Sequence, residues 1–95
     1  MGVSVMGVVW YKPEHYDALL GMFPDRDKLH STFEEWLKDA VRVTDQLRRN
    51  GIAFRKVFID PDTFPAWCAA RGLSLDAGAR ARFATEFVRG KAPHK

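Results

Sequence analysis

A nearly continuous apolar run occupies residues 3–11, and it constrains the fold more than any other segment of the chain. The run is rich in β-branched and aromatic side chains, with Ser4 inside it, and it lacks the polar–apolar alternation of a strand that has one wet face. It therefore predicts a strand buried on both faces, as in a parallel sheet covered by helices. Its length is too short to cross a bilayer.

Two helical patterns separate this strand from the next one. Pro13 opens the first helix, because a proline at the first helical position loses no hydrogen bond, and Pro24 closes the segment. The second helix follows Ser31-Thr32-Phe33-Glu34, a capping-box pattern that predicts Ser31 as the N-cap. In this second helix the apolar spacing predicts that Trp36 and Val41 are buried, and that Glu35, Lys38 and Arg42 are exposed.

Residues 52–59 predict the second strand, and two more helices follow it. The third helix begins near Asp62, because Pro65 is tolerated only in a first turn. Ser74 or Asp76 caps the fourth helix. A glycine follows each of the last three predicted helices, as is typical of helix C-termini.

These elements predict an α/β fold in the order β-α-α-β-α-α, with one domain over residues 1–90 and a flexible basic tail over residues 91–95. The long helical connection between the two short strands predicts that they are parallel, with helices covering them. Two parallel strands make a poor sheet by themselves. Either the sheet has a further strand that these patterns do not reveal, or a second chain completes the sheet or covers its open face; we expect the second chain.

Polar side chains follow both strands, and parallel strands place such side chains at one edge of the sheet, where open α/β folds bind ligands. Carboxylates and a histidine in such a position are candidate groups for metal binding or acid–base chemistry. The simpler interpretation is that they mark two helix starts, where acids favour the helix dipole. No metal or cofactor is expected. The candidate residues are Tyr11, Lys12, Glu14, His15, Asp60 and Asp62.

Positive charge is concentrated in the second half of the chain. The whole chain has a formal net charge of +3, and residues 51–95 hold eight Lys and Arg against four Asp and Glu. This asymmetry permits binding of nucleic acid or another polyanion, although a solvated helix surface is the simpler interpretation. The candidate anion-binding residues are Arg71, Arg80, Arg82 and Arg89, with Glu86 partly neutralising those beside it.

The remaining distinctive side chains are expected in the core or in an interface. Cys68 is the single cysteine, so no internal disulfide forms, and its apolar surroundings in the sequence predict a buried packing residue. Trp10, Trp36 and Trp67 fall on the apolar faces of three elements. Because the aromatic residues are numerous for a domain with two strands, some of them are expected at an interface.

Three hypotheses for the function follow from these observations. The preferred one is a cytoplasmic, non-enzymatic interaction module that forms a homodimer or binds a protein partner. The first alternative is a regulator that binds nucleic acid or another polyanion through the basic second half. The second alternative is a small metal-dependent or acid–base enzyme that uses the carboxyl-terminal edge of the strands.

Overall fold

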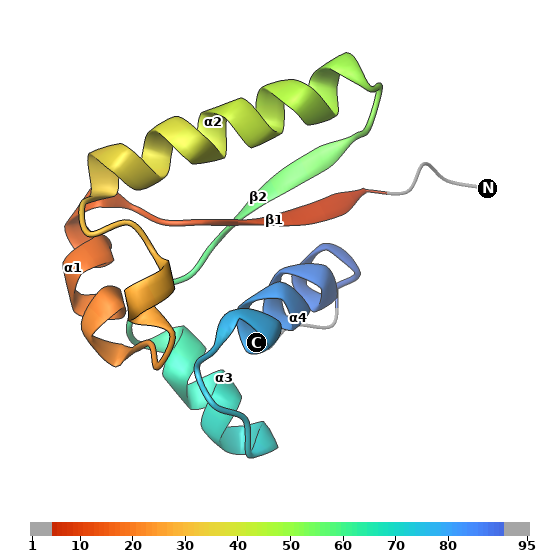
Figure 1. The fold of residues 1–95 in the computed structure, drawn as a ribbon. Coiled ribbons are helices and arrows are strands. Elements are labelled where there is room, and N and C mark those ends of the chain that lie inside the picture. Colours follow the sequence, from red (N-terminus) through yellow and green to blue (C-terminus); the bar gives the residue numbers. More distant parts are fainter. Residues whose placement is uncertain (1–4, 91–95) are drawn as a thin grey trace.

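A computed structural model of the chain describes residues 5–90, in the order β-α-α-β-α-α that the sequence predicts (Figure 1). The start of the predicted first strand and the predicted basic tail lie outside the described residues. The strands are β1 (Met6–Trp10) and β2 (Phe54–Phe58). The helices are α1 (Pro13–Met22), α2 (Phe33–Arg49), α3 (Thr63–Arg71) and α4 (Ala77–Val88), with a short 3-10 helix, η1 (Arg26–Lys28), before α2.

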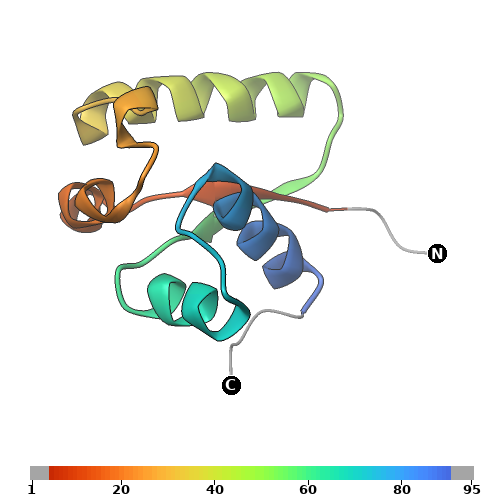
Figure 2. The same ribbon diagram turned by 60° about the horizontal axis from the view of Figure 1, so that its bottom comes forward.

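The two strands are parallel, as predicted, and their register runs from Met6 opposite Phe54 to Trp10 opposite Phe58. The helices form layers around them. Figure 2 shows α2 on one side of the strands and α3 and α4 on the other, with α1 beyond the end of β1. We call these the α2 face and the α4 face of the sheet.

The α4 face is closely packed. Helix α4 crosses β1 at Gly7, where an added Cβ would lie within 2.7 Å of the carbonyl carbon of Ala84. Phe83 of α4 packs edge-on against Trp67 and Phe64 of α3, with ring centroids 5.2 and 5.6 Å apart. Cys68 is fully buried in this layer, which confirms the prediction, and burial raises the pKa of its thiol.

The α2 face holds an aromatic cluster at the carboxyl-terminal end of β1. The ring of Trp36 lies 5.1 Å from that of Trp10 and 4.8 Å from that of Tyr11, in edge-to-face arrangements. Tyr16 of α1 and Phe33 of α2 extend the cluster. These contacts fix the first half of α2 against β1 and α1, because an edge-to-face pair of rings contributes stability in addition to that from the surface area it buries.

Helix α2 is packed more loosely than predicted. Glu35, Lys38 and Arg42 are exposed, as expected, but Trp36 is only half-buried. The prediction for Val41 is wrong, since its side chain is 44% exposed. The reason is geometric. A sheet of two strands is narrower than the apolar side of the helix, so the apolar residues at the two margins of that side have no strand to pack against.

The strands on this face are also more open than predicted. The prediction that β1 is buried on both faces is wrong, because Val8 and Val9 are half-buried and Met6 is 50% exposed. Phe58 of β2 is 45% exposed. Within residues 5–90 the sheet has two strands, so the outer edge of each strand has no neighbour there.

The helix starts differ from the predictions in two places. Thr32, not Ser31, is the N-cap of α2, and its hydroxyl oxygen accepts the N–H of Glu35 at 3.2 Å. Asp62 precedes α3 as predicted, but Asp60 does the capping, since its Oδ1 accepts the N–H groups of residues 62 and 63 at 2.9 and 2.6 Å. Asp76 caps α4.

Replacing Gly7 by alanine tests the close crossing of β1 and α4. The added methyl group would collide with backbone atoms of Ala84, which no side-chain rotation relieves. We expect Gly7→Ala to lower the free energy of unfolding by about 1–3 kcal/mol, measured by urea denaturation. Gly21 in α1 is the control, because nothing lies near its Cβ position and alanine favours a helix. Equal effects of the two substitutions would contradict the crossing.

Replacing Thr32 by alanine tests the start of α2. The substitution removes the acceptor for the N–H of Glu35, so we expect a loss of about 1 kcal/mol in thermal or urea unfolding. Ser31→Ala, one residue earlier, should change stability by less than about 0.5 kcal/mol. A larger loss of stability for Ser31→Ala than for Thr32→Ala would instead indicate that Ser31 is the N-cap.

Candidate functional site

The candidate residues at the carboxyl-terminal ends of the strands lie at two helix starts. The Asp60 carboxylate is engaged by the backbone N–H groups that it caps. Burial by itself raises the pKa of Asp60, but these hydrogen bonds and the nearby charge of His15 lower it overall. Glu14 is exposed in the first turn of α1, and the Lys12 ammonium lies over the ring of Phe58, 5.6 Å from its centroid. Nowhere in residues 5–90 do three His, Cys, Asp or Glu side chains converge as metal ligands.

Tyr11 belongs to the core and not to an exposed edge. Its side chain is 3% exposed and contacts the rings of Tyr16 and Phe23. Burial raises the pKa of its phenol to about 12, in spite of the nearby Arg80 guanidinium, which favours the ionised form. The phenol is therefore protonated at neutral pH.

Arg80 is also a core residue, so its assignment to an exposed anion-binding surface is corrected. Its side chain is buried, and its guanidinium donates two hydrogen bonds to the Asp25 carboxylate, at 3.0 and 2.7 Å, and one to the carbonyl of Leu75. The guanidinium also lies 4.2 Å from the ring centroid of Phe23. A buried arginine with these partners fixes α4 against the loop after α1.

Two of the other candidate arginines, Arg71 and Arg82, lie on either side of one acid, Glu86. Arg82 Nε donates to Glu86 Oε2 at 2.8 Å, and Arg71 Nη2 lies 3.9 Å from Glu86 Oε1. Both guanidinium groups also approach the ring of Trp67. Arg89 is exposed beside a hollow at the amino-terminal ends of the strands. The structure therefore does not gather the four arginines into one patch.

A different set of cations lies along β2, and sequence reasoning missed it. On the α2 face Arg48 lies over the ring of Phe54, with its Cζ 5.2 Å from the centroid. The Lys56 ammonium lies 4.2 Å from the ring centroid of Trp10. With Lys12 over Phe58, three cations alternate with three rings. The register of the strands and the packing of α2 on them bring these residues together, and no spacing along the chain indicates it.

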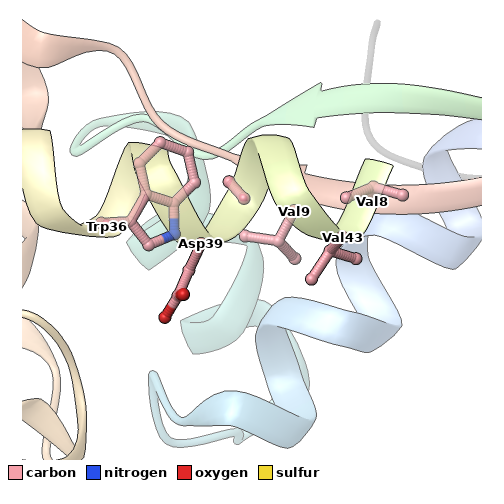
Figure 3. A pocket seen from close by; sticks show the side chains of 6 residues that line it. Val8, Val9, Trp36, Asp39 and Val43 are labelled. Atoms are coloured by element: carbon pink, nitrogen blue, oxygen red, sulfur yellow. The ribbon is translucent and has the colours of Figure 1, made fainter. Parts of the chain in front are cut away.

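Helix α2 leaves an open groove on each of its two sides. Figure 3 shows the one at the outer edge of β1, where the side chains of Val8 and Val9 from the strand lie beside those of Trp36 and Val43 from the helix. This groove measures about 280 Å³, and Val43 at its wall is 50% exposed. Asp39 at its rim is already engaged, by His30 Nε2 at 2.5 Å and by the Arg42 guanidinium.

The groove on the opposite side of α2 is larger and almost wholly apolar. It measures about 470 Å³ and is lined by Leu37 and Val41, with Glu34 and Lys38 beside them. It lies on the side of β2, because Arg48, on the same side of the helix, stacks on Phe54 of that strand. We call this side of α2 the Val41 flank, and the opposite side the Val43 flank.

Comparisons with known proteins add no family to this description. No protein-family model, curated protein or solved structure matches the chain. None of the helices within residues 5–90 has the length and apolar character needed to cross a membrane.

The buried Asp25–Arg80 pair gives a testable pH dependence. The hydrogen bond from Arg80 lowers the pKa of Asp25. A carboxylate whose pKa is lowered by folding stabilises the fold above its unfolded pKa, and that contribution is lost as the pH falls through the folded pKa. We expect Asp25→Asn to lower the free energy of unfolding by about 3 kcal/mol at pH 7, because it leaves a buried guanidinium without its counter-charge.

The difference between wild type and Asp25→Asn should shrink toward zero as the pH falls toward about 2, because the aspartate then becomes neutral as well. Urea denaturation at a series of pH values measures it. Asp27→Asn, at an exposed neighbouring position, is the control and should have little effect. A difference that is constant with pH would contradict the ion pair.

Proposed function

We propose that this chain is a non-enzymatic interaction module that binds a protein, itself or another chain, through helix α2. One observation supports the proposal above all: α2 has seventeen residues, and among them only Thr44 is buried, while Val41 and Val43 are about half-exposed on opposite sides. An amphipathic helix normally buries its apolar stripe. Here much of the stripe stays in contact with water until something else covers it.

The composition of the two flanks is that of a protein interface. Leu37 and Val41 form an apolar centre, and Glu34 and Lys38 border it with charge of both signs. Val8, Trp36 and Val43 form a second apolar area on the other side. Apolar areas with a charged border are typical of protein-binding surfaces, and covering them removes apolar surface from water, a gain of about 25 cal/mol per Å².

Photocrosslinking tests the proposal. The full chain carries benzoylphenylalanine in place of Val41 or of Val43, and it is irradiated in the cells that make it. We expect a discrete covalent adduct from at least one of these positions, identified by mass spectrometry as the chain itself or as one defined protein. Ala69, exposed on the distant helix α3, is the control position. No adduct from either position on α2, or equal adducts from Ala69, would contradict the proposal.

One observation favours a second candidate function, binding of a single-stranded nucleic acid or another polyanion. The cations along β2 could neutralise a phosphate backbone, and two of the three rings beside them are open to solvent: Phe58 is 45% exposed and Phe54 is half-buried, whereas Trp10 is buried. Cations interleaved with aromatic rings are the usual means of binding single strands without sequence preference.

Fluorescence anisotropy with a labelled oligonucleotide tests this second function. If the three cations on the α2 face of β2 contact phosphates, the logarithm of affinity should fall with the logarithm of salt concentration with a slope of about −2. Lys56→Glu should weaken binding, and Lys28→Glu, at an exposed site on η1, should weaken it much less. Equal losses for the two variants, or binding that salt does not change, would exclude this surface as a nucleic-acid site.

A further inference from the structure

We infer that the Val41 flank binds a second copy of this chain, through antiparallel packing of the two α2 helices about a two-fold axis at Val41. The inference rests on the proposed function and names its partner. The residues of the flank are Glu34, Leu37, Lys38, Val41, Asp45 and Arg48.

The six residues form one side of the helix. With 3.6 residues per turn, their positions fall within about 100° of arc around the axis. Leu37 and Val41 line the groove together with Glu34 and Lys38. Asp45 and Arg48 continue the same side by one turn, and their side chains are linked by a hydrogen bond of 3.0 Å. The flank is therefore a continuous strip, apolar in the middle and charged toward both ends.

The order of charges along this strip makes it complementary to an inverted copy of itself. Glu34 lies seven residues before Val41 and Arg48 seven residues after it. At a rise of about 1.5 Å per residue, each lies about 10.5 Å from a two-fold axis at Val41, so Glu34 of one copy meets Arg48 of the other. Lys38 and Asp45 lie about 4.5 and 6 Å from that axis and oppose each other in the same way.

Self-complementarity is what selects a second copy over an unrelated protein. A two-fold interface uses the same patch on both chains, so every contact occurs twice. The four charges form two opposite-sign pairs across the axis, and the like charges of the two copies stay apart. Val41 contacts Val41 of the second copy at the centre, where an exposed apolar side chain gains most from being covered. Binding of an unrelated protein would not require the four charges to be arranged symmetrically about Val41.

The contact is assigned to the helices and not to pairing of the strands below them. Lys56 lies in the middle of β2, and Arg55 beside it is also exposed. A cation in the middle of an edge strand discourages pairing of that strand with its own copy, because the pairing would bring the two like charges close together. The ammonium of Lys56 lies on the ring of Trp10, on the neighbouring strand β1. The two β2 edges can therefore approach without forming a common sheet.

The Val43 flank lacks this arrangement and supplies the controls. Asp39 is the one charged residue that lines its groove, so this groove offers no opposite-sign pairs to an inverted copy of itself. Val43 is about as exposed as Val41, so a charge introduced at either position has a comparable local cost. Glu35 is in the same turn as Glu34 but lies about 100° farther round the helix, outside the Val41 flank.

Sedimentation equilibrium of the full chain with charge-swapped variants tests the inference. We expect wild type to dimerise, and Glu34→Lys and Arg48→Glu each to raise the dissociation constant by about tenfold or more, since each places like charges together at two symmetric sites. An equimolar mixture of the two variants should regain the wild-type affinity, because the mixed dimer again has opposite charges at both sites. Loss of folding cannot produce this recovery.

Val41→Lys should abolish the dimer, whereas Val43→Lys and Glu35→Lys should leave it unchanged. Circular dichroism verifies that each variant is folded. A wild-type monomer at every loading, or a mixture of Glu34→Lys and Arg48→Glu that stays monomeric, would overturn the inference. The proposed function would survive that outcome if benzoylphenylalanine at position 41 still formed an adduct with one defined protein, and it would fail if positions 41 and 43 both formed none.

Discussion

The absence of a side chain at Gly7 is the constraint on which the rest of the structure depends. It allows the backbone of α4 to approach β1 closely at Ala84, and this approach places Phe83 against the rings of α3. As a result the α4 face of the sheet is buried, and so are Val57 of β2 and residues of α3 such as Cys68. A larger residue in the middle of β1 would lift α4 and open this layer.

The two faces of the sheet are unequal, and the inequality locates the functional surface. The α4 face is closed by packing, and the Asp25–Arg80 pair joins α4 to the loop after α1. The α2 face is held mainly at one end, through Trp36 and its neighbours Trp10 and Tyr11. Beyond that end α2 rests on a sheet too narrow to cover both of its sides. Apolar surface for a partner is therefore available on this face.

Much of the fold could be predicted from the sequence, because its signals are local. The signals of the apolar run before Tyr11, of the proline at position 13 and of the fourth N-cap, which is narrowed to Ser74 or Asp76, depend on a few neighbouring residues each. The wrong prediction of Ser31 as the N-cap of α2 also came from a local signal. Ser31 and Thr32 are both good N-cap residues, and only the backbone conformation distinguishes them. Local patterns therefore predict which helices and strands form, and they place the ends of each one to within one or two residues.

The candidate site was less predictable, because it depends on what lies beside each residue in space. Spacing shows that Val41 is on the apolar side of its helix, but not that two strands are too narrow to reach it. Arg80 looks like any surface arginine until Asp25, 55 positions earlier, is placed against it. The stacking of Lys56 on Trp10 likewise follows from the register of the two strands.

The position of α4 along the chain has a consequence for folding during synthesis. It is the last element in the described residues, yet it covers the strand that is made first. While a ribosome is still adding residues before Ala77, the α4 face of β1 and the rings of Phe64 and Trp67 lack the contacts that Ala84 and Phe83 give them. The hydrophobic interior on this face cannot close in that interval. Closure of the α4 face therefore has to wait for the element that comes last in the described residues.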